Sequence, residues 1–575
     1  MKTKYILALL ILLYQTDLFS QSTSLDWAYA IGGTADDQVT SMAKDNFGHI
    51  FTTGLYYGTL DFDPNAGSSN LTSSSSAYGI FIQKIDYSSN LIWAKSIGDN
   101  STSYNTLTSN SITTDNSGNI YITGEFEGTV DFNPNAGINT LSSVSSSIED
   151  VFILKLDSSG NFLWVKSIGG SIYNTNSRTI TTDVNGDMYI AGEFGGSVDF
   201  DPNAGTYTLS NGGHFALKLD ANGNFIWAKE VQANWYVTSI KTDDDSNVYL
   251  CGSFDGIVDF DPGINTYNLT ATISGNDIYL LKLNTQGDFI WAKNFGSDGS
   301  ENESLDMEID LNGDVYITGF FNDTLDFDPG PGVFELYSKP STSSDNIFIT
   351  KLDSSGNFSW AATADGNGQS YGYSISSDFV GNVYVTGYCS GTFDFDPSPN
   401  SYNLTTINGA DIFILSLNTS GNFRWANIIG GSDPILNRGK SILTDTIGNV
   451  YVGGHFEETV DFDPGTGVLN YTSNVNNTTD LFVLKLNQTP AVGINTHKNY
   501  IEDFLIYPNP TLGQLNITSK NGTIQQIIIT DITGKTLKTA TSNFNSIAVN
   551  ELKTGTYIIK IKSEKGLSVQ KFIKH

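Results

Sequence analysis

The chain has 575 residues, of which 39% are hydrophobic and only 16% charged, and it contains 57 glycines. This composition is typical of strands and turns, and it excludes a coiled coil or a helical solenoid. The formal charge of −32 repels phosphate backbones and anionic lipid, so we expect no nucleic-acid partner, and cations and neutral polymers remain as candidates.

The first 20 residues have the layout of a secretory signal peptide. Lys2 and Lys4 precede an apolar run over residues 5–14, and Ser20 stands before the expected cleavage point. A membrane anchor is the alternative, but so short a run cannot cross about 30 Å of hydrocarbon, and no other segment has the ~20 apolar residues required. We therefore expect an exported chain without a transmembrane segment.

Residues 21–487 contain seven copies of a unit of roughly 66 residues. Three series of residues keep the same phase in every copy. The first is a tryptophan: Trp27, Trp93, Trp164, Trp227, Trp291, Trp360 and Trp425. The second is an aromatic residue with a glycine three positions later: Phe51, Tyr121, Tyr189, Tyr249, Tyr316, Tyr384 and Tyr451. The third is a variant of Phe-Ile-Leu-Lys-Leu-Asp that begins at Phe81, Phe152, Phe215, Tyr279, Phe348, Phe413 and Phe482.

Each copy has the pattern of four short strands. In the second copy these are residues 111–114, 119–124, 151–156 and 161–166, which are rich in β-branched and aromatic residues. Asp and Gly stand where a type I turn needs them in residues 115–118 and 157–160, which predicts two tight hairpins. We expect both hairpins on one face, and the long connections between second and third strands on the opposite face, where function usually lies.

A repeated four-stranded unit is typical of a β-propeller. The first tryptophan strand, residues 25–31, has no partner before it, and the last Phe-Val-Leu-Lys-Leu strand, residues 482–486, has no tryptophan strand after it. We therefore predict an all-β fold, a seven-bladed propeller of four-stranded blades in which the N-terminal strand completes the seventh blade and removes an open edge. An open β-solenoid is the alternative, and it does not explain these two complementary gaps.

The run from Gly118 to Gly124, Gly-Asn-Ile-Tyr-Ile-Thr-Gly, and its six counterparts resemble the SBBP-type seven-bladed propeller repeat of exported bacterial proteins. The resemblance extends over about residues 25–487. It implies the fold and carries over no catalytic residues, because the motif of that family is structural.

A fourth series, Asp-Phe-Asp-Pro or a close variant, lies in the long connections. Its members begin at Asp61, Asp131, Asp199, Asp259, Asp326, Asp394 and Asp461. Three of them continue as alternating oxygen-bearing residues followed by a glycine: Asp61, Asp63 and Asn65; Asp131, Asn133 and Asn135; Asp199, Asp201 and Asn203. Such spacing suits a calcium ion. The alternative is that the aspartates accept backbone N–H groups in turns, because no glutamate is fixed at the twelfth position and proline stiffens the loop.

Residues that differ between copies can build one site on a repeated scaffold. Directly after the glycine of the second series the chain carries a mixed polar and aromatic set: Leu55, Glu125, Glu193, Ser253, Phe320, Tyr388 and His455. We predict that this set binds a ligand, and its chemistry suits a neutral glycan or a peptide. The alternative is that these are ordinary strand-end residues.

The sequence contains no recognisable catalytic motif. The five histidines occupy unrelated places in the repeat, and there is no His-x-x-x-His pair or serine elbow. Glu125 and Glu193 are equivalent residues of adjacent copies, so the carboxylate pair of a glycan-active enzyme is conceivable, but repetition alone explains it. We expect no enzymatic activity, and we expect Cys251 and Cys389 to be buried free thiols rather than a disulfide.

The repeats end near residue 488, and residues 488–503 are predicted to be a linker. Residues 504–575 contain nine lysines and three acidic residues, so the sign of the charge changes there. Strand-like runs alternate with glycine turns, which predicts a small Ig-like β-sandwich.

Four blocks of residues 504–575 carry a second resemblance. They are Tyr507-Pro508-Asn509-Pro510, a turn with Gly534 and Lys535, a strand start with Gly555 and Tyr557, and the terminal Lys-Phe-Ile-Lys. In this order they resemble the type A sorting domain of the type IX secretion system of Gram-negative bacteria. The resemblance implies handling by the type IX machinery through residues 504–575, followed by attachment to the cell surface or release. A sandwich that merely binds the propeller or a carbohydrate is the alternative.

These observations predict a secreted or surface-attached propeller that acts as a non-catalytic binding or adhesion scaffold for an extracellular glycan or protein. A glycan-active enzyme that uses the loop face and a purely structural surface protein are the alternatives.

Overall fold

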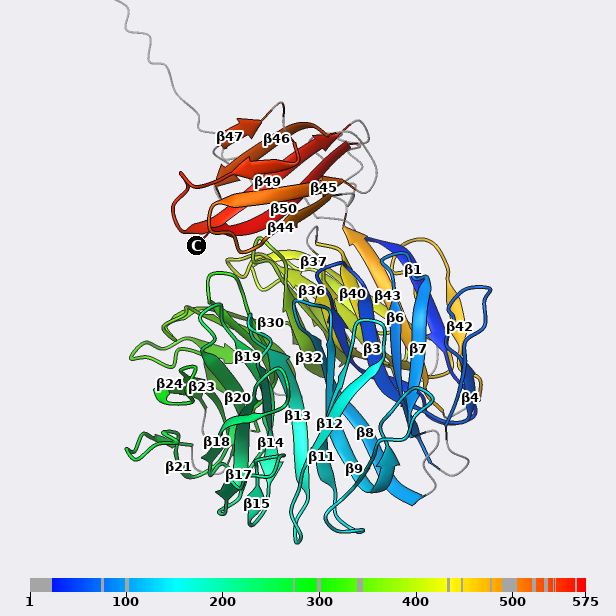
Figure 1. The fold of residues 1–575 in the computed structure, drawn as a ribbon, viewed down its shortest axis with the longest axis vertical. Helices are drawn as coiled ribbons and strands as arrows, with labels where there is room; N and C mark the ends of the chain where they lie inside the picture. Colours follow the sequence, from blue (N-terminus) through cyan, green and yellow to red (C-terminus); the bar gives the residue numbers. More distant parts are fainter. Residues whose placement is uncertain are drawn as a thin grey trace, which may run out of the picture. The chain divides into compact units, whose positions relative to one another are not determined.

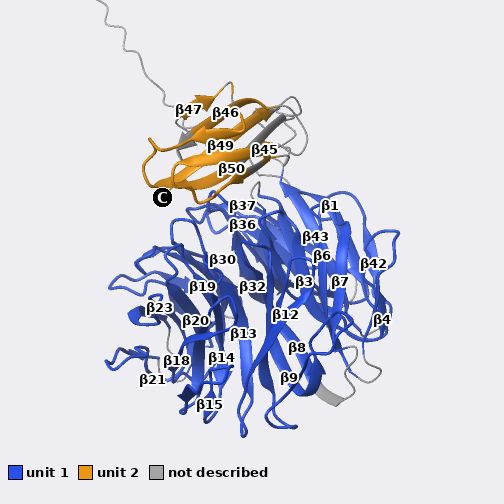
Figure 2. Cartoon of the chain, viewed as in Figure 1, with its two compact units in different colours: residues 1–491 blue, residues 492–575 orange. Residues whose placement is uncertain are grey.

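The computed structural model describes residues 23–574 except 74–76, 99–102, 272–274, 297–300, 339–344, 432–434, 446–447, 476–477, 489–503, 520–523, 532–535, 541, 543 and 564–565. The predicted signal peptide and nearly all of the predicted linker lie outside the described residues. The chain divides into two compact units, residues 1–491 and residues 492–575 (Figure 2). Among the described residues, no helix is long and apolar enough to cross a membrane.

The larger unit contains seven sheets, the blades of a propeller, each built on four antiparallel strands and two of them extended by shorter strands (Figure 1). The first three blades are β2 (Gln38–Lys44), β3 (Ile50–Tyr56), β6 (Gly79–Ile85) and β7 (Leu91–Ile97); β8 (Ser103–Thr114), β9 (Ile120–Asp131), β11 (Asp150–Leu156) and β12 (Phe162–Ile168); and β13 (Thr175–Thr182), β14 (Met188–Phe194), β17 (Gly213–Leu219) and β18 (Phe225–Val231). The next three are β19 (Val237–Thr242), β20 (Val248–Phe254), β23 (Asp277–Leu283) and β24 (Phe289–Phe295); β25 (Glu303–Ile309), β26 (Val315–Phe321), β29 (Asn346–Leu352) and β30 (Phe358–Thr363); and β32 (Gln369–Ser377), β33 (Val383–Ser390), β36 (Gly409–Leu417) and β37 (Phe423–Gly431).

The seventh blade closes the ring with the start of the chain. It consists of β39 (Arg438–Thr444), β40 (Val450–Phe456), β43 (Asp480–Gln488) and β1 (Thr23–Ile31). Strand β1 pairs antiparallel with β43, with Ala28 opposite Leu484. The prediction that the N-terminal strand completes the last blade is confirmed.

The blades pack face to face, and the first strand of each is innermost. Strands β2, β8, β13, β19, β25, β32 and β39 each pack against the next member of this series, and β39 packs against β2. Every residue of the central strands β6, β11 and β23 is buried. The hydrophobic cores therefore lie between blades, as in the cluster that joins Ile82 of the first blade to Ile122 and Phe152 of the second.

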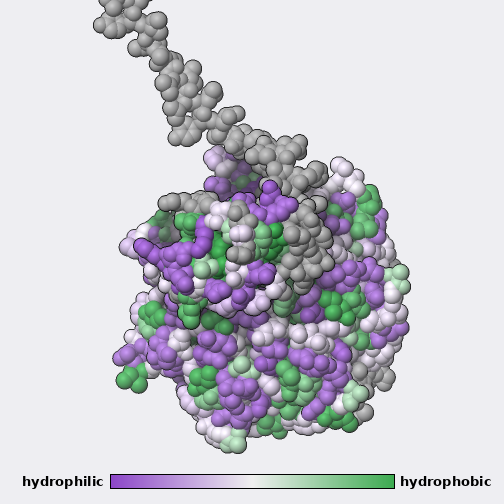
Figure 3. Space-filling model, turned by 45° about the horizontal axis from the view of Figure 1, so that its top comes forward, coloured by the Kyte–Doolittle hydropathy of each residue, from purple (hydrophilic) through white to green (hydrophobic). Residues whose placement is uncertain are grey.

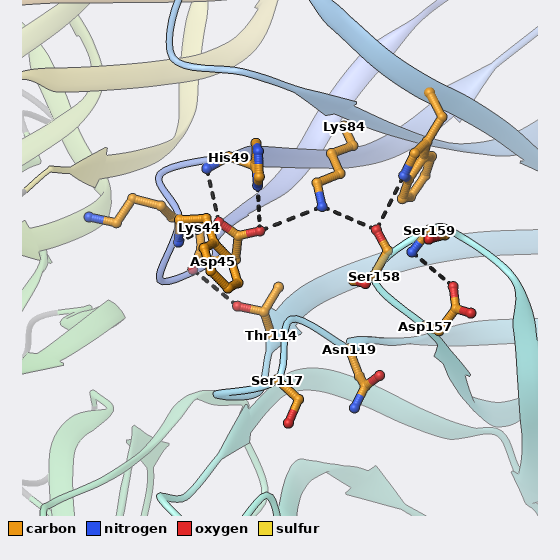
Figure 4. Close-up of polar contacts among 12 residues, drawn as sticks. Lys44, Asp45, His49, Lys84, Thr114, Ser117, Asn119, Asp157, Ser158 and Ser159 are labelled. Atoms are coloured by element: carbon orange, nitrogen blue, oxygen red, sulfur yellow. Dashed lines mark hydrogen bonds and ion pairs between the residues drawn. The ribbon is translucent and has the colours of Figure 1, made fainter. Parts of the chain in front are cut away.

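A lysine of the third strand helps to fix the tight hairpins (Figure 4). The ammonium of Lys84 lies 4.8 Å from the centroid of the Phe51 ring and 3.5 Å from Asp45 Oδ2, and it donates to the carbonyl of Ser158 in the next blade at 3.1 Å. Asp45 also accepts the amides of its own turn, at residues 47 and 49. In the sixth blade Ser416 replaces this lysine, and the guanidinium of Arg424 lies over the ring of Tyr384 instead. These repeated residues are scaffold.

The long connection of each blade contains a small hairpin of its own, which the sequence analysis did not predict. In most blades two short strands pair: β4 (Thr59–Asp61) with β5 (Asn70–Thr72), β15 (Val198–Asp199) with β16 (Thr208–Leu209), β21 (Ile257–Asp259) with β22 (Asn268–Thr270), β27 (Thr324–Asp326) with β28 (Glu335–Tyr337), β34 (Thr392–Asp394) with β35 (Asn403–Thr405), and β41 (Thr459–Asp461) with β42 (Asn470–Thr472). In the second blade β10 (Thr140–Ser142) pairs with the end of β9, and the short strands β31 (Asp365–Gly366) and β38 (Ile435–Leu436) pair with β34 and β36.

The smaller unit is a sandwich of two sheets. One sheet contains β44 (Phe504–Tyr507), β45 (Gln514–Ser519) and β48 (Ser546–Ala548), and the other contains β47 (Thr536–Ala540), β46 (Ile524–Asp531), β49 (Gly555–Ser563) and β50 (Gly566–Lys574). One hydrophobic core between them joins Ile517 to Ile527, Ile559 and Phe572. The predicted β-sandwich is confirmed.

Candidate functional site at the centre of the propeller

The innermost strand of every blade carries a β-bulge at the same place. A bulge leaves one residue outside the ladder and redirects its side chain. The residues skipped by the pairing form what we call the bulge ring: Thr40, Asn110, Arg178, Thr238, Leu305, Tyr373 and Lys440. The faces of each blade are packed against neighbouring blades, yet these side chains are partly or fully exposed. Their exposure is therefore toward the centre of the ring.

A second set of inner-strand residues lies two positions earlier, toward the blade-to-blade linkers. We call this set the linker-side ring: Gln38, Thr108, Asn176, Tyr236, Glu303, Tyr371 and Arg438. Its members, like those of the bulge ring, differ from blade to blade. Together the two rings supply a non-repeating surface on a repeated scaffold.

The predicted ligand-binding set lies one strand behind these rings. Six of its members pair directly with the linker-side ring: Leu55 with Gln38, Glu125 with Thr108, Glu193 with Asn176, Phe320 with Glu303, Tyr388 with Tyr371, and His455 with Arg438. The seventh, Ser253, donates its backbone amide to the carbonyl of Tyr236 at 2.9 Å. All except Leu55 and Glu193 are buried. The predicted residues therefore lie at the correct end of each blade, but on the second strand rather than on the first strand, which faces the centre.

A small hydroxyl residue follows the bulge in most blades and joins the inner strands to one another. Ser441 accepts the amide of Met42 at 3.1 Å, and Ser41 accepts that of Ile112 at 3.3 Å. The carboxylate of Asp306 has this role in the fifth blade, where it accepts the amide of Ile375 at 3.1 Å. Both rings are therefore held on a cross-linked frame. A variable residue followed by a small hydroxyl residue is the sequence signal that could have located the bulge ring.

The two glutamates considered as a catalytic pair each bridge two blades. Glu125 accepts from the hydroxyl of Thr108 at 2.7 Å, the amide of Asn110 at 2.9 Å and the backbone N–H of Ser177 in the next blade at 2.8 Å. Burial raises the pKa of Glu125 to about 7, partly offset by these hydrogen bonds. Both carboxylate oxygens of Glu125 are occupied by scaffold donors.

Glu193 repeats this bridge one blade later. It accepts the backbone N–H of Val237 at 3.0 Å and the Nε–H of Arg178 at 2.9 Å. Burial raises the pKa of this carboxyl as well. Because both glutamates bridge two blades in the same way, a structural role accounts for the pair.

Aromatic side chains gather in the fifth and sixth blades. The rings of Tyr371 and Tyr388 are stacked with centroids 5.0 Å apart, and Phe320 packs on Tyr371 at 4.5 Å. Tyr373 of the bulge ring lies 6.4 Å from Tyr371. The hydroxyl of Tyr371 donates to Asp345. Phe320 and Tyr388 of the predicted set thus support an aromatic cluster, although other strands present it to the centre.

We expected the long connections to lie on the face opposite the tight hairpins. Their tips do not stay on that face. Asn65 donates to the carbonyl of Ser89 at 3.1 Å, and Asn203 donates to that of Gly223 at 3.1 Å, so both tips reach the tight turns between third and fourth strands. Aromatic residues such as Tyr207 pack on the fourth strand, 4.9 Å from Phe225. The expectation was wrong because the additional hairpin folds each connection back along the outer edge of its blade.

The first aspartate of each of these loops has the same hydrogen bonds. Asp61 Oδ1 accepts the amide of Asp63 at 3.1 Å and that of Ser69 at 2.7 Å, and the other six loops repeat both contacts. The amide of Ser69, with that of Asp63, lowers the pKa of Asp61. A Cβ on Gly67 would lie 1.9 Å from Asp63 Oδ2, so the turn itself requires this glycine. Turn chemistry accounts for these residues, and calcium binding stays an untested prediction.

The two cysteines and the motif residues of the smaller unit complete the set of predicted residues. Cys251 and Cys389 are buried free thiols, as predicted, and burial raises the pKa of Cys251 to about 11. In the smaller unit Tyr507 is exposed and Tyr557 packs on Phe572 at 5.6 Å. Asn509 accepts the amide of Ile573 at 2.8 Å, which ties the Tyr-Pro-Asn-Pro run to the last strand. Gly534 and Lys535 lie outside the described residues.

Two protein-family models match the chain. Residues 505–575 match the secretion system C-terminal sorting domain, and residues 92–125 match a beta-propeller repeat, the SBBP family. Both resemblances seen in the sequence are confirmed. The C-terminal unit is a type IX secretion sorting domain, so the protein is exported to the cell surface or beyond it.

The chain also has more distant similarities to known proteins. The chain is 23% identical over 446 residues to the WD repeat-containing protein L264 of Acanthamoeba polyphaga mimivirus, covering 64% of this chain and 31% of that relative. Among solved structures it is similar to PorZ, a surface component of the type-IX secretion system of Porphyromonas gingivalis, with 12% identity, 93% of this chain and 81% of that chain covered, and a TM-score of 0.29. Sqt1 from Chaetomium thermophilum has 10% identity, coverage of 82% and 100%, and a TM-score of 0.36.

Proposed function

We propose that this chain, an exported propeller with a C-terminal sorting domain, is a non-catalytic binding module that holds an extracellular glycan or protein at the centre of its ring. One observation carries the proposal: seven bulges place side chains of six different types toward the centre, while the small hydroxyl residues that join the inner strands repeat in six of the seven blades. A scaffold needs no such variety, whereas an asymmetric ligand does.

The chemistry of the two rings supports binding rather than catalysis. Most ring residues are hydroxyls, amides and aromatics, which supply hydrogen bonds and flat contact surfaces. The carboxylates nearest to a catalytic arrangement, Glu125 and Glu193, accept backbone amides across blade junctions. On the face visible in Figure 3 hydrophobic residues form small groups among hydrophilic ones, so that view gives no support to a broad apolar docking surface.

Screening the labelled full-length chain on glycan and peptide arrays tests the proposal. We expect saturable binding of one ligand class that weakens at least tenfold in Tyr236→Ala and Tyr373→Ala. The matched control is Asn46→Ala, which removes a contact between two tight turns far from the rings. Binding that persists in both ring variants would overturn the proposed location, and a chain without any saturable ligand would favour a purely structural surface protein. Turnover of a bound glycan that disappears in Glu125→Gln would favour the enzyme alternative.

A further inference from the structure

Two cations of the seventh blade face the centre of the ring without an acidic partner. Arg438 belongs to the linker-side ring and Lys440 to the bulge ring, two residues apart on β39. Neither forms an ion pair with any described residue, although the chain has a formal charge of −32. Arg178, in contrast, pairs with Glu193 at 2.9 Å. A pair of like charges left without a counter-ion in so acidic a chain indicates a place for an anion.

Aromatic faces hold these two cations in place. The guanidinium of Arg438 lies 5.3 Å from the ring centroid of Tyr388 and 6.0 Å from that of Tyr373. The ammonium of Lys440 lies 4.1 Å from the centroid of Tyr373. Cation–π contacts of this kind orient a cation but leave its N–H donors free for a carboxylate. Burial, with repulsion from Arg438, lowers the pKa of Lys440 to about 8, so the amine remains largely protonated at neutral pH.

Unsatisfied buried atoms beside the cations support the same conclusion. The Nε of Arg438 and the Nδ1 of His455 are buried and have no hydrogen-bond partner among the described residues. His455 is only 7% exposed and pairs with Arg438 across the two inner strands. Buried polar groups without partners are rare in folded proteins and call for an explanation such as a missing ligand.

The rest of the two rings suits hydroxyl groups. In the first four blades the ring residues that are not bound to Glu125 include amide and hydroxyl side chains: Gln38, Thr40, Asn176 and Thr238. Hydroxyls of a sugar can donate to and accept from such groups, and tyrosine edges and faces add contact surface. An acidic peptide would supply carboxylates too, but its backbone and side chains do not need a ring of neutral hydroxyls and amides.

Building on the proposed binding function, we propose that the ligand is an acidic saccharide whose carboxylate is bound by Arg438 and Lys440 while its hydroxyl groups contact the neutral polar residues of the two rings.

Calorimetry with the full-length chain tests this. The probes are a panel of uronate- and sialate-bearing oligosaccharides, the neutral methyl ester of each, and triglutamate as an acidic peptide. We expect at least one acidic oligosaccharide to bind saturably and its methyl ester to bind at least tenfold more weakly. Arg438→Gln and Lys440→Gln should each weaken binding of the acid at least tenfold. Lys95→Gln removes a positive charge from the outer strand β7 and should leave the affinity unchanged; thermal melting of every variant checks the fold.

Each other outcome contradicts the proposal in a distinguishable way. Equal binding of acid and ester, or unchanged affinity in Arg438→Gln, means that the two cations do not bind a carboxylate of the ligand. The proposed binding function would still hold if a neutral ligand binds at the two rings. Triglutamate that binds better than every saccharide identifies an acidic-peptide site instead. No binding of any acidic saccharide overturns this inference alone, because the proposed function is tested on arrays with other variants.

Discussion

Blades 2 and 3 place charged residues at the same sites of the scaffold as blade 7 does, and the two regions use these charges in opposite ways. In blades 2 and 3, Glu125 and Glu193 accept the backbone amides of the next blade, and Arg178 pairs with Glu193. In blade 6 the same sites carry tyrosines and in blade 7 they carry Arg438 and His455, and no carboxylate that the structure describes forms an ion pair with Arg438 or Lys440. The difference shows that the scaffold needs only hydrogen bonds across each blade junction. Charged side chains that do not take part in these hydrogen bonds, such as Arg438, are available to a ligand.

The largest expected effect is a difference in the free energy of unfolding between a variant of blade 2 and a variant of blade 7. Glu125→Leu leaves the amide of Ser177 and the side chains of Thr108 and Asn110 without their acceptor, which should lower the free energy of unfolding by about 2–4 kcal/mol. Lys440→Met removes a cation whose charged form is disfavoured by burial, so it should leave the free energy of unfolding unchanged or raise it. Urea denaturation of both full-length variants measures the contrast. Similar losses in the two variants would mean that the cations of blade 7 are scaffold as well.

The pH dependence of stability should differ in sign between the two regions. Burial raises the pKa of Glu125 to about 7, so the folded state binds the proton more tightly than the unfolded state, and stability falls as pH rises through 5 to 7. The pKa of Lys440 is lowered to about 8, so the unfolded state holds more protons between pH 8 and 10, and stability rises with pH there. Each slope is at most about 1.4 kcal/mol per pH unit. Melting curves should show a flatter profile below pH 7 in Glu125→Gln and above pH 8 in Lys440→Gln; a variant with an unchanged profile would contradict the assigned group.

The cation of the sixth-blade scaffold provides a smaller test. Arg424 donates to Tyr384 at 2.7 Å and to Ser416 at 2.8 Å, in place of the lysine found in the other blades. Arg424→Ala should cost about 1–2 kcal/mol, because both the hydrogen bonds and the cation–π contact are lost. Adding Ser416→Lys should recover part of that loss by restoring the arrangement of blade 1. Thermal melting of the single and double variants measures the recovery, and a double variant no more stable than the single one would show that the two arrangements are not interchangeable.

The smallest expected effect concerns the Asp-Phe-Asp-Pro loops. Asp61→Ala should cost about 1 kcal/mol in a chelator, because two backbone amides lose their acceptor. If these loops also bind calcium, the cost should grow when calcium is added, because an ion bound to the native state raises its stability. Melting temperatures with chelator and with calcium measure the difference. An identical cost under both conditions would assign Asp61 to turn chemistry alone.

Much of the fold could be predicted because repetition amplifies weak local signals. The tryptophan, Tyr-x-x-Gly and Phe-Ile-Leu-Lys-Leu series each mark one strand, and the two missing partners predicted the pairing of β1 with β43. The outer hairpins were missed because strands of two or three residues, such as β4 and β5, are too short to show an alternating pattern. Their absence from the prediction put the loop tips on the wrong face.

The candidate site could be predicted only in part, for a definite physical reason. In the second copy the first strand was predicted to begin at Ser111, but β8 begins at Ser103 and continues through the bulge at Asn110. A bulge shifts the two-residue alternation by one, so the pattern that identifies a strand ends there. The predicted set therefore fell on the regular second strands, and the centre-facing residues were left out.

The pairing of β1 with β43 has a consequence for how the protein reaches its folded state. Residues that meet there, such as Ala28 and Leu484, are separated by nearly the whole propeller, so their contact has the largest loop-closure entropy of any pairing in the ring. Blades built from neighbouring segments can form early, whereas the last blade has to wait until its first and final strands are both available. Until then each end of the arc presents a strand edge that can pair with another molecule. Exported chains therefore pass through an open, association-prone stage, and a peptide with the sequence of β1 should trap it.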